Sequence, residues 1–580
     1  MAAVYQKQRY SRGALKSTRL AISVLLIIIA AFILLTGRCL YLQLVRNDHY
    51  NSISVRQQQK RIVQKARRGP ILDSTGEVLA VSNQVKTIFA EPRIIEKPEE
   101  LSTQLAAVLH IGGRQIYDAI TQSRNPGFAK IKVDASREEC EAAARFYGVG
   151  VQTNFRRYYP AGPLAAHITG FTSLDNRGLS GIELQYDEEL SGVEGQKVFF
   201  ADAWPYRREL SLRRQKQVSD GFGIILTIDA SIQEFLRTEL LKQYLIYQAE
   251  SAVAIVARPQ TGEILAMASI PDFEPGDAAS ADANNFRNRA VNDQFEPGSI
   301  LKPIVASIAL DAGVINRDEK IFCENGLYAG KGFGSIREYR NHGYGRLSVR
   351  EILVKSSNIG MAKIGRRLGK DKLHRGLKLF GFGEETGVEL PGESAGLLWP
   401  VSKWTGYSVT RIPFGQEISV TAIQLIRAYC ILANGGRDVR PHIVKALVDN
   451  DGNIRRIKGP ASAVGFVIRP ESARWIVREA LTDVVNEGTG RRARLEQWQV
   501  FGKTGTANIA KQNERGYSQE NYIASFIAGA PSEKPAVLVL VSIRKPNKKL
   551  GKGYTGGRVA SPVAAAILRK TLKYLRLPED

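Results

Sequence analysis

Cysteine and histidine are scarce in this sequence, and neither occurs in a pattern typical of a metal site or a disulfide framework. The 580 residues include four cysteines with no CxxC pair and six histidines with no HExxH spacing. Scattered single cysteines argue against a disulfide-stabilised scaffold and against a cysteine-based zinc site. We therefore expect no metal, haem or other cofactor, and the chemistry has to come from other side chains.

Acidic residues are outnumbered, with 57 Asp+Glu against 81 Lys+Arg and a formal net charge of +24. Such an excess first suggests a polyanionic partner, which could be nucleic acid or an anionic membrane. The apolar content of 44% and charged content of 24% are ordinary for a packed protein, which excludes a largely disordered or collagen-like chain. The length predicts two or three domains.

Only one long uncharged run is present, LAISVLLIIIAAFILLTG at residues 20–37. As a helix it would be ~27 Å long, close to the ~30 Å hydrocarbon core, so it predicts a transmembrane anchor that ends at residue 37 or, with the next apolar segment, at 45. A buried core helix and a cleaved signal peptide are the alternatives. The run is longer than the apolar region of a signal peptide and lacks an A-x-A-like site, which favours the anchor.

The segment before the run carries five basic residues and no acid, so the positive-inside rule places residues 1–19 in the cytoplasm. Everything after the anchor then lies outside the cytoplasm, and nucleic acid is excluded as a partner. Much of the remaining positive charge is expected to face anionic lipid headgroups and the cell wall, beginning with a basic stalk at 49–72.

Two extracytoplasmic domains are predicted, with a boundary at residue 220. Residues 38–220 mix strands and helices and are interpreted as a pedestal domain, in which His167 has a structural role because no nucleophile motif lies near it. Residues 221–580 begin with strands, continue with helices from about 299 to 435, and return to strands near 497–545 before a last helix. This order favours an α+β domain with an antiparallel sheet flanked by helices.

A first chemical motif is Ser299-Ile300-Leu301-Lys302, at the predicted start of a helix. Residues i and i+3 share a helix face, so the Lys302 amine can lie against the Ser299 hydroxyl. A serine hydroxyl needs a base to become a nucleophile, and a lysine can serve when burial lowers its pKa. Pro303 fits only near a helix start, which places Ser299 in the first turn.

Two more motifs follow, Ser356-Ser357-Asn358 and Lys503-Thr504-Gly505-Thr506. Ser356 lies between two predicted helices and could relay a proton, while Asn358 could bind a substrate amide. The third motif, Lys503-Thr504-Gly505-Thr506, is expected just after a strand at 497–501. There Gly505 would let a substrate backbone approach, and Lys503 with the two threonine hydroxyls would bind a carboxylate. The backbone N–H groups of Ser299 and Thr506 could form an oxyanion hole.

Each motif alone is a weak signal, but their order and spacing resemble those of penicillin-binding proteins and serine β-lactamases. The chain further resembles class B penicillin-binding proteins of the FtsI type, the septal peptidoglycan D,D-transpeptidases. The similar segments are RGPILDSTGEVLAVS, RYYP, AAHITGFT, GIELQYD, RNRAVNDQFEPGS, TGVELPGES, FGQEISVTAIQL and YTGGRVASPV. The chain departs from the family at Ser74, where Arg is usual, and at Ser180, where Glu is usual.

The resemblance implies a penicillin-binding protein dimerisation-type pedestal, a serine β-lactamase-like transpeptidase domain and a cofactor-free acyl transfer. Ser299 would attack the penultimate D-Ala carbonyl of one stem peptide, D-Ala would leave, and an amine of a neighbouring stem peptide would resolve the acyl-enzyme. Whether Lys302 or Ser356 acts first as base stays open. Penicillin and other β-lactams would acylate the same serine. A SEDS-type glycosyltransferase and other divisome proteins are the implied partners, at the division septum.

Three alternatives remain. The first is an elongation-type transpeptidase. The sequence segments GFT at 170–172 and FGQ at 414–416 argue against it. The second is a membrane-anchored β-lactamase or β-lactam sensor, although the sequence has no ExxLN element between Asn358 and Lys503. The third is a non-enzymatic divisome scaffold, which would not need all three motifs.

Overall fold

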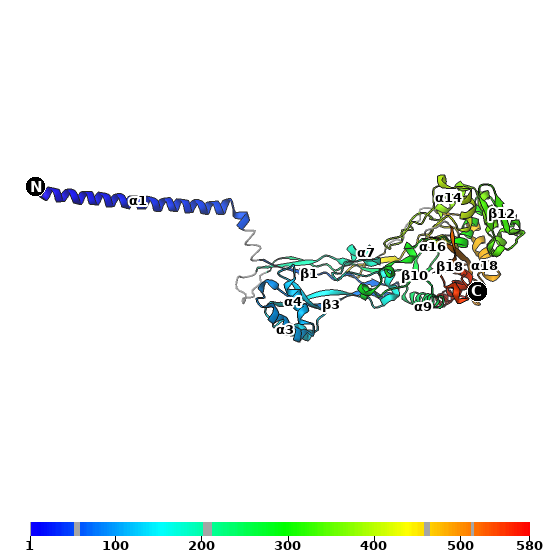
Figure 1. The fold of residues 1–580 in the computed structure, drawn as a ribbon, viewed down its shortest axis with the longest axis horizontal. Helices are drawn as coiled ribbons and strands as arrows, with labels where there is room; N and C mark the ends of the chain where they lie inside the picture. Colours follow the sequence, from blue (N-terminus) through cyan, green and yellow to red (C-terminus); the bar gives the residue numbers. More distant parts are fainter. Residues whose placement is uncertain (1, 51–58, 201–211, 457–464, 512–515, 580) are drawn as a thin grey trace. The chain divides into compact units, whose positions relative to one another are not determined.

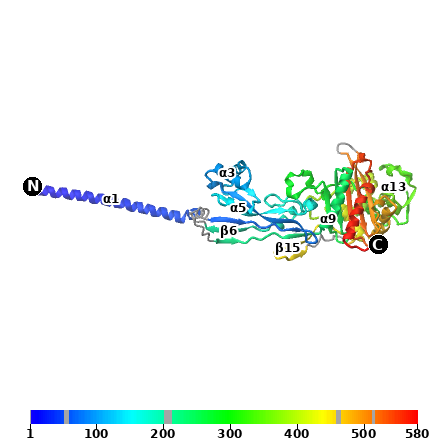
Figure 2. The same ribbon diagram turned by 90° about the horizontal axis from the view of Figure 1, so that it is seen from below.

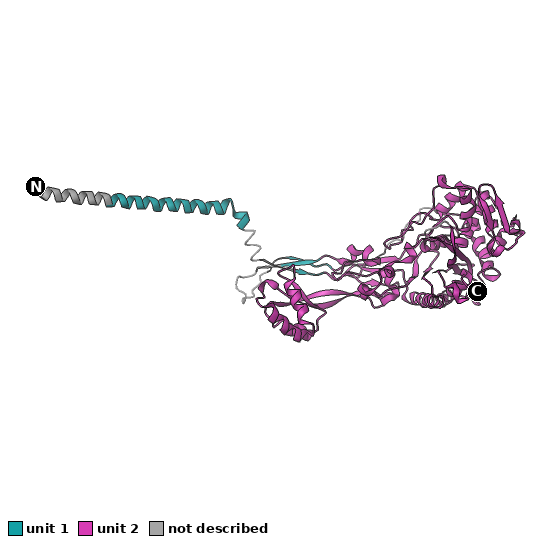
Figure 3. Cartoon of the chain, in the orientation of Figure 1, with its two compact units in different colours: residues 1–65, 194–219 teal, residues 66–193, 220–580 magenta. Residues whose placement is uncertain are grey.

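The structure is a computed structural model that describes residues 2–50, 59–200, 212–456, 465–511 and 516–579. The chain forms two compact units (Figure 3), one of residues 1–65 with 194–219 and one of residues 66–193 with 220–580. Part of the predicted basic stalk, including Arg56, lies outside the described residues.

The first unit contains the apolar helix and a small sheet. Helix α1 (Ala2–Leu44) runs without a break through the predicted tail and anchor (Figure 1). Its apolar part, Ser17–Leu44, contains an 18-residue stretch with a mean hydropathy of 2.9, and at ~1.5 Å per residue these 28 residues are long enough to cross a ~30 Å hydrocarbon core. The sheet is antiparallel in the order β1-β6-β7. Its strands are β1 (Gln59–Gln64), β6 (Gly195–Phe200) and β7 (Leu212–Lys216).

The second unit begins with a small α/β core of its own. Leu101, Leu105 and Leu109 recur on one face of α3 and pack with buried strand residues. Helix α5 starts at a capping box formed by Ser136 and Glu139, which explains its sharp beginning. The elements are α3 (Pro98–Leu109), α4 (Gly113–Thr121), α5 (Arg137–Ala143), β3 (Val78–Ala90), β4 (Ala129–Val133) and β5 (Val149–Tyr158).

A seven-stranded sheet continues from this core across residue 220. Its order is β16-β15-β8-β2-β3-β4, with β5 also paired to β3. A turn at 73–76 joins β2 to β3 and ends at Gly76, which has a φ of 97°. Strand β2 runs parallel to β8, with Ile71 opposite Ile224. The remaining strands are β2 (Ile71–Leu72), β8 (Gly223–Leu226), β15 (Val444–Val448) and β16 (Ile454–Arg456).

A buried ionic network lies beside this sheet. The Glu183 carboxylate, fully buried, accepts hydrogen bonds from Arg68 Nε at 2.5 Å and from Arg157 Nε at 2.6 Å. Arg68 also donates to Asp187 at 2.6 Å. These residues come from the sequence segments RGP, RYYP and GIELQYD, which therefore meet in space. Three short helices supply part of the surroundings: α6 (Ala166–Thr169), α7 (Gly181–Gln185) and α8 (Asp187–Ser191).

A five-stranded antiparallel sheet forms the centre of the C-terminal part, in the order β10-β9-β19-β18-β17. Alternate residues of β9 enter two different cores, with Val253 and Ile255 on one face and Ala254 and Val256 on the other. Figure 2 shows α9 and the red C-terminal helix α20 together at one face. The elements are β9 (Ser251–Ala257), β10 (Ile264–Ile270), β17 (Phe501–Ala510), β18 (Tyr517–Ala530), β19 (Val537–Arg544), α9 (Ala230–Tyr247) and α20 (Ser561–Tyr574).

The other face of this sheet is covered by helices, and the predicted α+β class with a flanked antiparallel sheet is confirmed. Four short strands, which the sequence did not indicate, interrupt the helical segment as two antiparallel pairs. They are β11 (Lys320–Phe322), β12 (Leu327–Gly330), β13 (Gly334–Arg337) and β14 (Arg346–Ser348). The helices are α10 (Arg289–Asn292), α11 (Lys302–Asp311), α12 (Val349–Val354), α13 (Asn358–Leu368), α14 (Lys370–Leu379), α15 (Gly406–Arg411), α16 (Ala422–Ala433), α17 (Pro470–Trp475), α18 (Thr482–Asn486) and α19 (Gly556–Val559).

Candidate active site

Ser299 lies in a 3₁₀ turn, residues 298–301, that leads directly into α11. The sequence predicted that Ser299 lies in the first turn of the helix. In the structure it lies one turn before the α-helix begins. Gly298 has a φ of 55°, and its N–H donates to the Gly415 carbonyl at 3.0 Å. The Tyr429 hydroxyl donates to the Ile300 carbonyl at 2.8 Å from the buried side. The turn that carries Ser299 is thus held from two directions.

Lys302 is fully buried beneath this turn. Its Nζ donates to the Ser356 carbonyl at 2.6 Å and to Asn358 Oδ1 at 2.8 Å, and lies 3.2 Å from Ser356 Oγ. Burial lowers the pKa of Lys302 to about 7, against a smaller opposing effect of the Glu338 charge. In the part of the chain that the structure describes, no hydrogen bond joins Lys302 to Ser299, so the predicted contact is replaced here by contacts to the second motif.

The second motif forms the loop between α12 and α13, as predicted. Ser356 has a φ of 59°, and both of its oxygens contact Lys302. Ser357 caps α13 by accepting the Gly360 N–H at 2.9 Å. The loop is held by the carboxylate of Glu338, a residue that sequence reasoning missed: it accepts from the Ser357 hydroxyl at 2.5 Å and from the Asn358 N–H at 2.7 Å. No local pattern links Glu338 to the loop, because it comes from the end of β13.

The third motif lies within a strand, which corrects the prediction that it follows a strand at 497–501. Residues 503–506 belong to β17, which forms one edge of the five-stranded sheet. Lys503 is fully buried, and its Nζ donates to Ser356 Oγ at 3.0 Å. Burial, together with the nearby Lys302 charge, holds the pKa of Lys503 well below its usual range. The Ser356 hydroxyl therefore contacts two buried lysines.

Gly505 has a packing reason that differs from the predicted one. A Cβ at this position would lie 2.9 Å from Cγ1 of Ile300 and 3.1 Å from the Pro297 carbonyl oxygen. The missing side chain thus lets β17 pack against the turn that carries Ser299, rather than against a substrate. On either side of it, Thr504 Oγ1 lies 2.6 Å from Thr489 Oγ1, and Thr506 Oγ1 accepts the Gly556 N–H at 3.1 Å.

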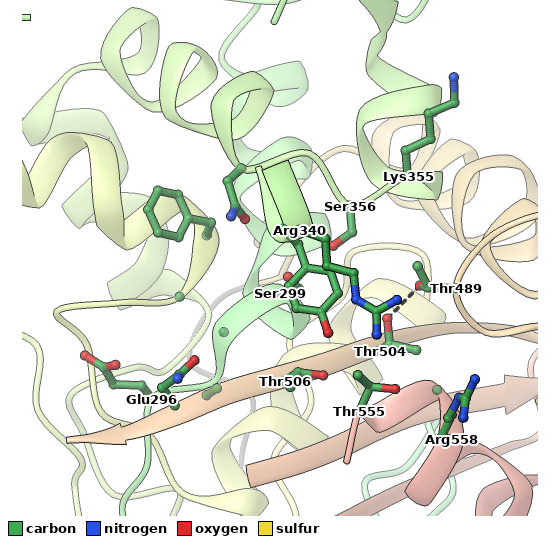
Figure 4. Close-up of a pocket in the computed structure, with 18 of the residues that line it drawn as sticks. Glu296, Ser299, Arg340, Lys355, Ser356, Thr489, Thr504, Thr506, Thr555 and Arg558 are labelled. Carbon is green, nitrogen blue, oxygen red and sulfur yellow. Dashed lines mark hydrogen bonds between the residues drawn. The ribbon is translucent and has the colours of Figure 1, made fainter. Parts of the chain in front are cut away.

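The three motifs meet at one cleft of about 490 Å³ (Figure 4). Five of the eight predicted site residues line it, and the other three, Lys302, Lys503 and Gly505, lie behind its wall. His167 is buried against Phe273, with its Nε2 2.7 Å from the Asn285 carbonyl oxygen, and burial lowers its pKa to about 4. The predicted site residues on the cleft surface are Ser299, Ser356, Asn358, Thr504 and Thr506.

Two family descriptions match the chain. "Penicillin binding protein transpeptidase domain" matches residues 252–569, and "Penicillin-binding Protein dimerisation domain" matches residues 63–225. The chain is 34% identical to Stage V sporulation protein D of Bacillus subtilis over 95% of this chain and 85% of the relative. It is 29% identical to peptidoglycan D,D-transpeptidase FtsI of Escherichia coli, over 95% and 91%. Penicillin-binding protein 3 of Mycobacterium tuberculosis in complex with aztreonam has a similar structure, with 25% identity, a TM-score of 0.70 and coverage of 90% and 98%.

Proposed function

Because this chain belongs to the class B penicillin-binding proteins, the serine-type D-Ala-D-Ala transpeptidases of peptidoglycan, we propose that Ser299 is its nucleophile and Lys302 the base. Membership of this family implies that the substrate is peptidoglycan and that β-lactams bind to the enzyme. One observation supports this assignment of residues. Lys302 and Lys503 both contact Ser356 Oγ, directly behind the cleft that Ser299 lines.

Lys302 is suited to accept a proton. With a pKa of about 7, a large share of the molecules carry the neutral amine at neutral pH. Two of its contacts are with oxygens that only accept hydrogen bonds, the Ser356 carbonyl and Asn358 Oδ1. The neutral amine satisfies both with its two N–H bonds and keeps its lone pair for the proton of the nucleophile.

Ser356 is proposed to carry that proton to the leaving amine. Its hydroxyl lies 3.2 Å from Lys302 Nζ and 3.0 Å from Lys503 Nζ, and it opens to the cleft. Backbone N–H groups of Ser299 and Thr506 would stabilise the oxyanion. Asn358 would bind a substrate amide, and Lys503 with the hydroxyls of Thr504 and Thr506 would attract the terminal carboxylate.

The reaction then proceeds in two steps. Ser299 Oγ bonds to the penultimate D-Ala carbonyl carbon, the peptide C–N bond breaks, and D-Ala leaves with the relayed proton. In the second step, the amine of a neighbouring stem peptide bonds to the same carbon, and Ser299 Oγ leaves and regains a proton. A β-lactam enters the first step and stays bound, because its ring-opened amine remains attached.

Labelling with a fluorescent penicillin tests the assignment. We expect covalent label on the wild-type protein, none on the Ser299→Ala variant, and wild-type labelling of the matched variant Ser402→Ala, whose serine is exposed and lies outside the cleft. Equal labelling of the Ser299→Ala variant would refute Ser299 as the nucleophile.

We further propose that the enzyme cross-links septal peptidoglycan during division, anchored by α1 with its N-terminus in the cytoplasm. The similarity to FtsI of Escherichia coli and the GFT and FGQ segments support this role. The partners would be a SEDS-type glycosyltransferase and other divisome proteins. A second candidate is wall synthesis during sporulation, which the similarity to Stage V sporulation protein D favours.

Imaging a fluorescent fusion in growing cells separates these roles. Bands at midcell before constriction support the septal role. Uniform sidewall signal would indicate an elongation role, and signal confined to sporulating cells would favour the second candidate.

A further inference from the structure

The cleft carries a strongly uneven charge. One carboxylate, Glu296, lines it, against the five cations Arg340, Lys355, Arg491, Arg492 and Arg558. Figure 4 shows Glu296 at one end of the cleft, Lys355 and Arg558 toward the other, and the Arg340 guanidinium directed to Thr504. Glu296 is also engaged, since it accepts hydrogen bonds from the Glu417 N–H and the Tyr517 hydroxyl.

These cations are not neutralised by neighbouring acids. Within the described ranges, none of the four guanidinium groups at 340, 491, 492 and 558 forms an ion pair with a carboxylate. Lys355 lies 3.9 Å from Glu351 in an exposed helix pair, a contact that contributes little. All five side chains are exposed, and Arg491, whose Nε donates to the Glu487 carbonyl at 2.8 Å, keeps its other N–H groups for an anion.

The end of the cleft that carries Arg340 and Arg558 also holds the Thr489–Thr504 hydroxyl pair, and Arg491 lies two positions after Thr489 in the chain (Figure 4). On the proposed function, on which this inference rests, the Thr504 hydroxyl marks the place of the departing D-Ala. That molecule brings a single carboxylate, whereas five cations line the cleft. The excess calls for a second anionic ligand at the same end.

The second step of the reaction indicates that this anionic ligand is the acceptor stem peptide. The acceptor amine attacks the acyl carbon along the path by which the first amine left, because the two steps are the reverse of one another with different amines. The departing amine sits next to a carboxylate. An acceptor whose amine also belongs to an amino acid centre, as in diaminopimelate, reproduces this arrangement, but a lysine side-chain amine or a carboxamide-capped centre does not.

We propose that the cationic end of the cleft is the acceptor subsite, and that it selects a stem peptide with a free carboxylate next to its attacking amine. Arg491 and Arg492, which follow Thr489 after Gly490, form its wall together with Arg558, whose N–H donates to the Thr555 carbonyl at 2.9 Å. Carboxylates elsewhere on the acceptor strand would strengthen binding at the same cations. In the step itself the acceptor nitrogen bonds to the acyl carbon, the bond from that carbon to Ser299 Oγ breaks, and one amine proton passes to Ser299.

Competition between two amines for one acyl-enzyme tests the proposal. The full-length protein in detergent is acylated with a thioester analogue of the donor peptide. It is then offered equal amounts of meso-diaminopimelate acetylated on its L-centre amine, and of the same compound with its D-centre carboxylate converted to a carboxamide. The ratio of the two products, measured by mass spectrometry, does not depend on how fast the acyl-enzyme forms.

We expect the wild type to favour the carboxylate acceptor by about tenfold or more, and the preference to shrink with added salt. The carboxamide amine is the less protonated of the two, so intrinsic reactivity works against this result. The double variant Arg491→Gln/Arg492→Gln, and Arg558→Gln separately, should bring the ratio near one. Arg569→Gln, which removes an exposed arginine of α20, should keep the wild-type ratio.

A wild-type ratio near one, or variants that keep the wild-type ratio, would overturn the acceptor subsite while penicillin labelling of Ser299 leaves the proposed function standing. Failure of that labelling would instead refute the proposed function, and this inference with it.

Discussion

The Glu338 carboxylate accepts a hydrogen bond of 2.5 Å from the Ser357 hydroxyl, 19 positions away in the chain. The same carboxylate accepts the N–H groups of Asn358 at 2.7 Å and Ile359 at 3.2 Å. It therefore stands at the N-terminus of α13, where backbone N–H groups have no partner within the helix. Through this contact an acid outside the three motifs positions the loop that carries Ser356.

Replacing Glu338 by glutamine should slow acylation. The amide keeps the size of the side chain but has one accepting atom, so a buried donor loses its partner at a cost of about 1–3 kcal/mol. We expect the second-order rate constant for penicillin acylation to fall by about tenfold or more. Because the Glu338 charge raises the pKa of Lys302, its loss should also move the pH midpoint of acylation downward.

The matched variant Glu520→Gln, which changes an exposed acid outside the cleft, should behave as wild type. An unchanged rate constant together with an unchanged pH midpoint for Glu338→Gln would show that Glu338 does not position the loop.

Acylation by penicillin should accelerate as pH rises through about 7. Below the pKa of Lys302, its ammonium has no lone pair and cannot take the serine proton, whereas above that pKa the amine can. Rate constants measured from pH 5.5 to 8.5, with the melting temperature followed at each pH, separate this effect from unfolding. A flat profile in a stably folded protein would remove Lys302 from the role of base.

Removing the charge of Glu183 should destabilise the second unit. The variant Glu183→Ala leaves the buried guanidinium groups of Arg68 and Arg157 without their shared carboxylate. Breaking a buried ion pair from one side typically costs about 3–5 kcal/mol, so the midpoint of denaturant unfolding should drop clearly. Exposed Glu188 is the control, and its replacement by alanine should leave the midpoint in place. Equal midpoints for the two variants would contradict a stabilising network.

Alanine at Gly505 should impair catalysis through packing. Its Cβ would lie 2.9 Å from Ile300, closer than ordinary contact, and would displace the turn that holds Ser299. Overpacking of this kind costs about 1–3 kcal/mol, and we expect slower penicillin acylation with a lower melting temperature. Adding Ile300→Val to this variant should restore part of the acylation rate and part of the melting temperature. Gly112→Ala, at a site with no atom within 4 Å of the added Cβ, serves as the control. Acylation at the wild-type rate would contradict the packing role.

The sequence predicted the fold class and the residues at the cleft, but not the tertiary contacts that position those residues. Strand β9 reads as a continuous apolar run because both of its faces are covered, which agrees with the strands predicted at the start of residues 221–580. The i, i+3 spacing of Ser299 and Lys302 brought both residues to the site, but it did not indicate that Lys302 contacts Ser356 and Asn358 instead of Ser299. The short strands β11–β14 escaped notice because three or four residues are too few to show a period.

The partners of the motifs could not be predicted, because tertiary contacts alone bring them together. Glu338 and Tyr429 support the site from segments that carry no motif of their own. The third motif was placed after a strand rather than inside one, and the packing reason for Gly505 cannot be seen without Ile300 and Pro297 beside it.

The parallel pairing of β2 with β8 has a practical consequence for anyone who wishes to produce the catalytic half alone. A recombinant fragment that begins at residue 221 would leave one side of β8 without its neighbour, and unpaired strand edges recruit other chains. It would also lose Asp73, whose carboxylate accepts the Ala230 N–H at the start of α9. Soluble material for crystallisation or inhibitor screening should therefore begin before β2, at about Ala66, where the second unit starts.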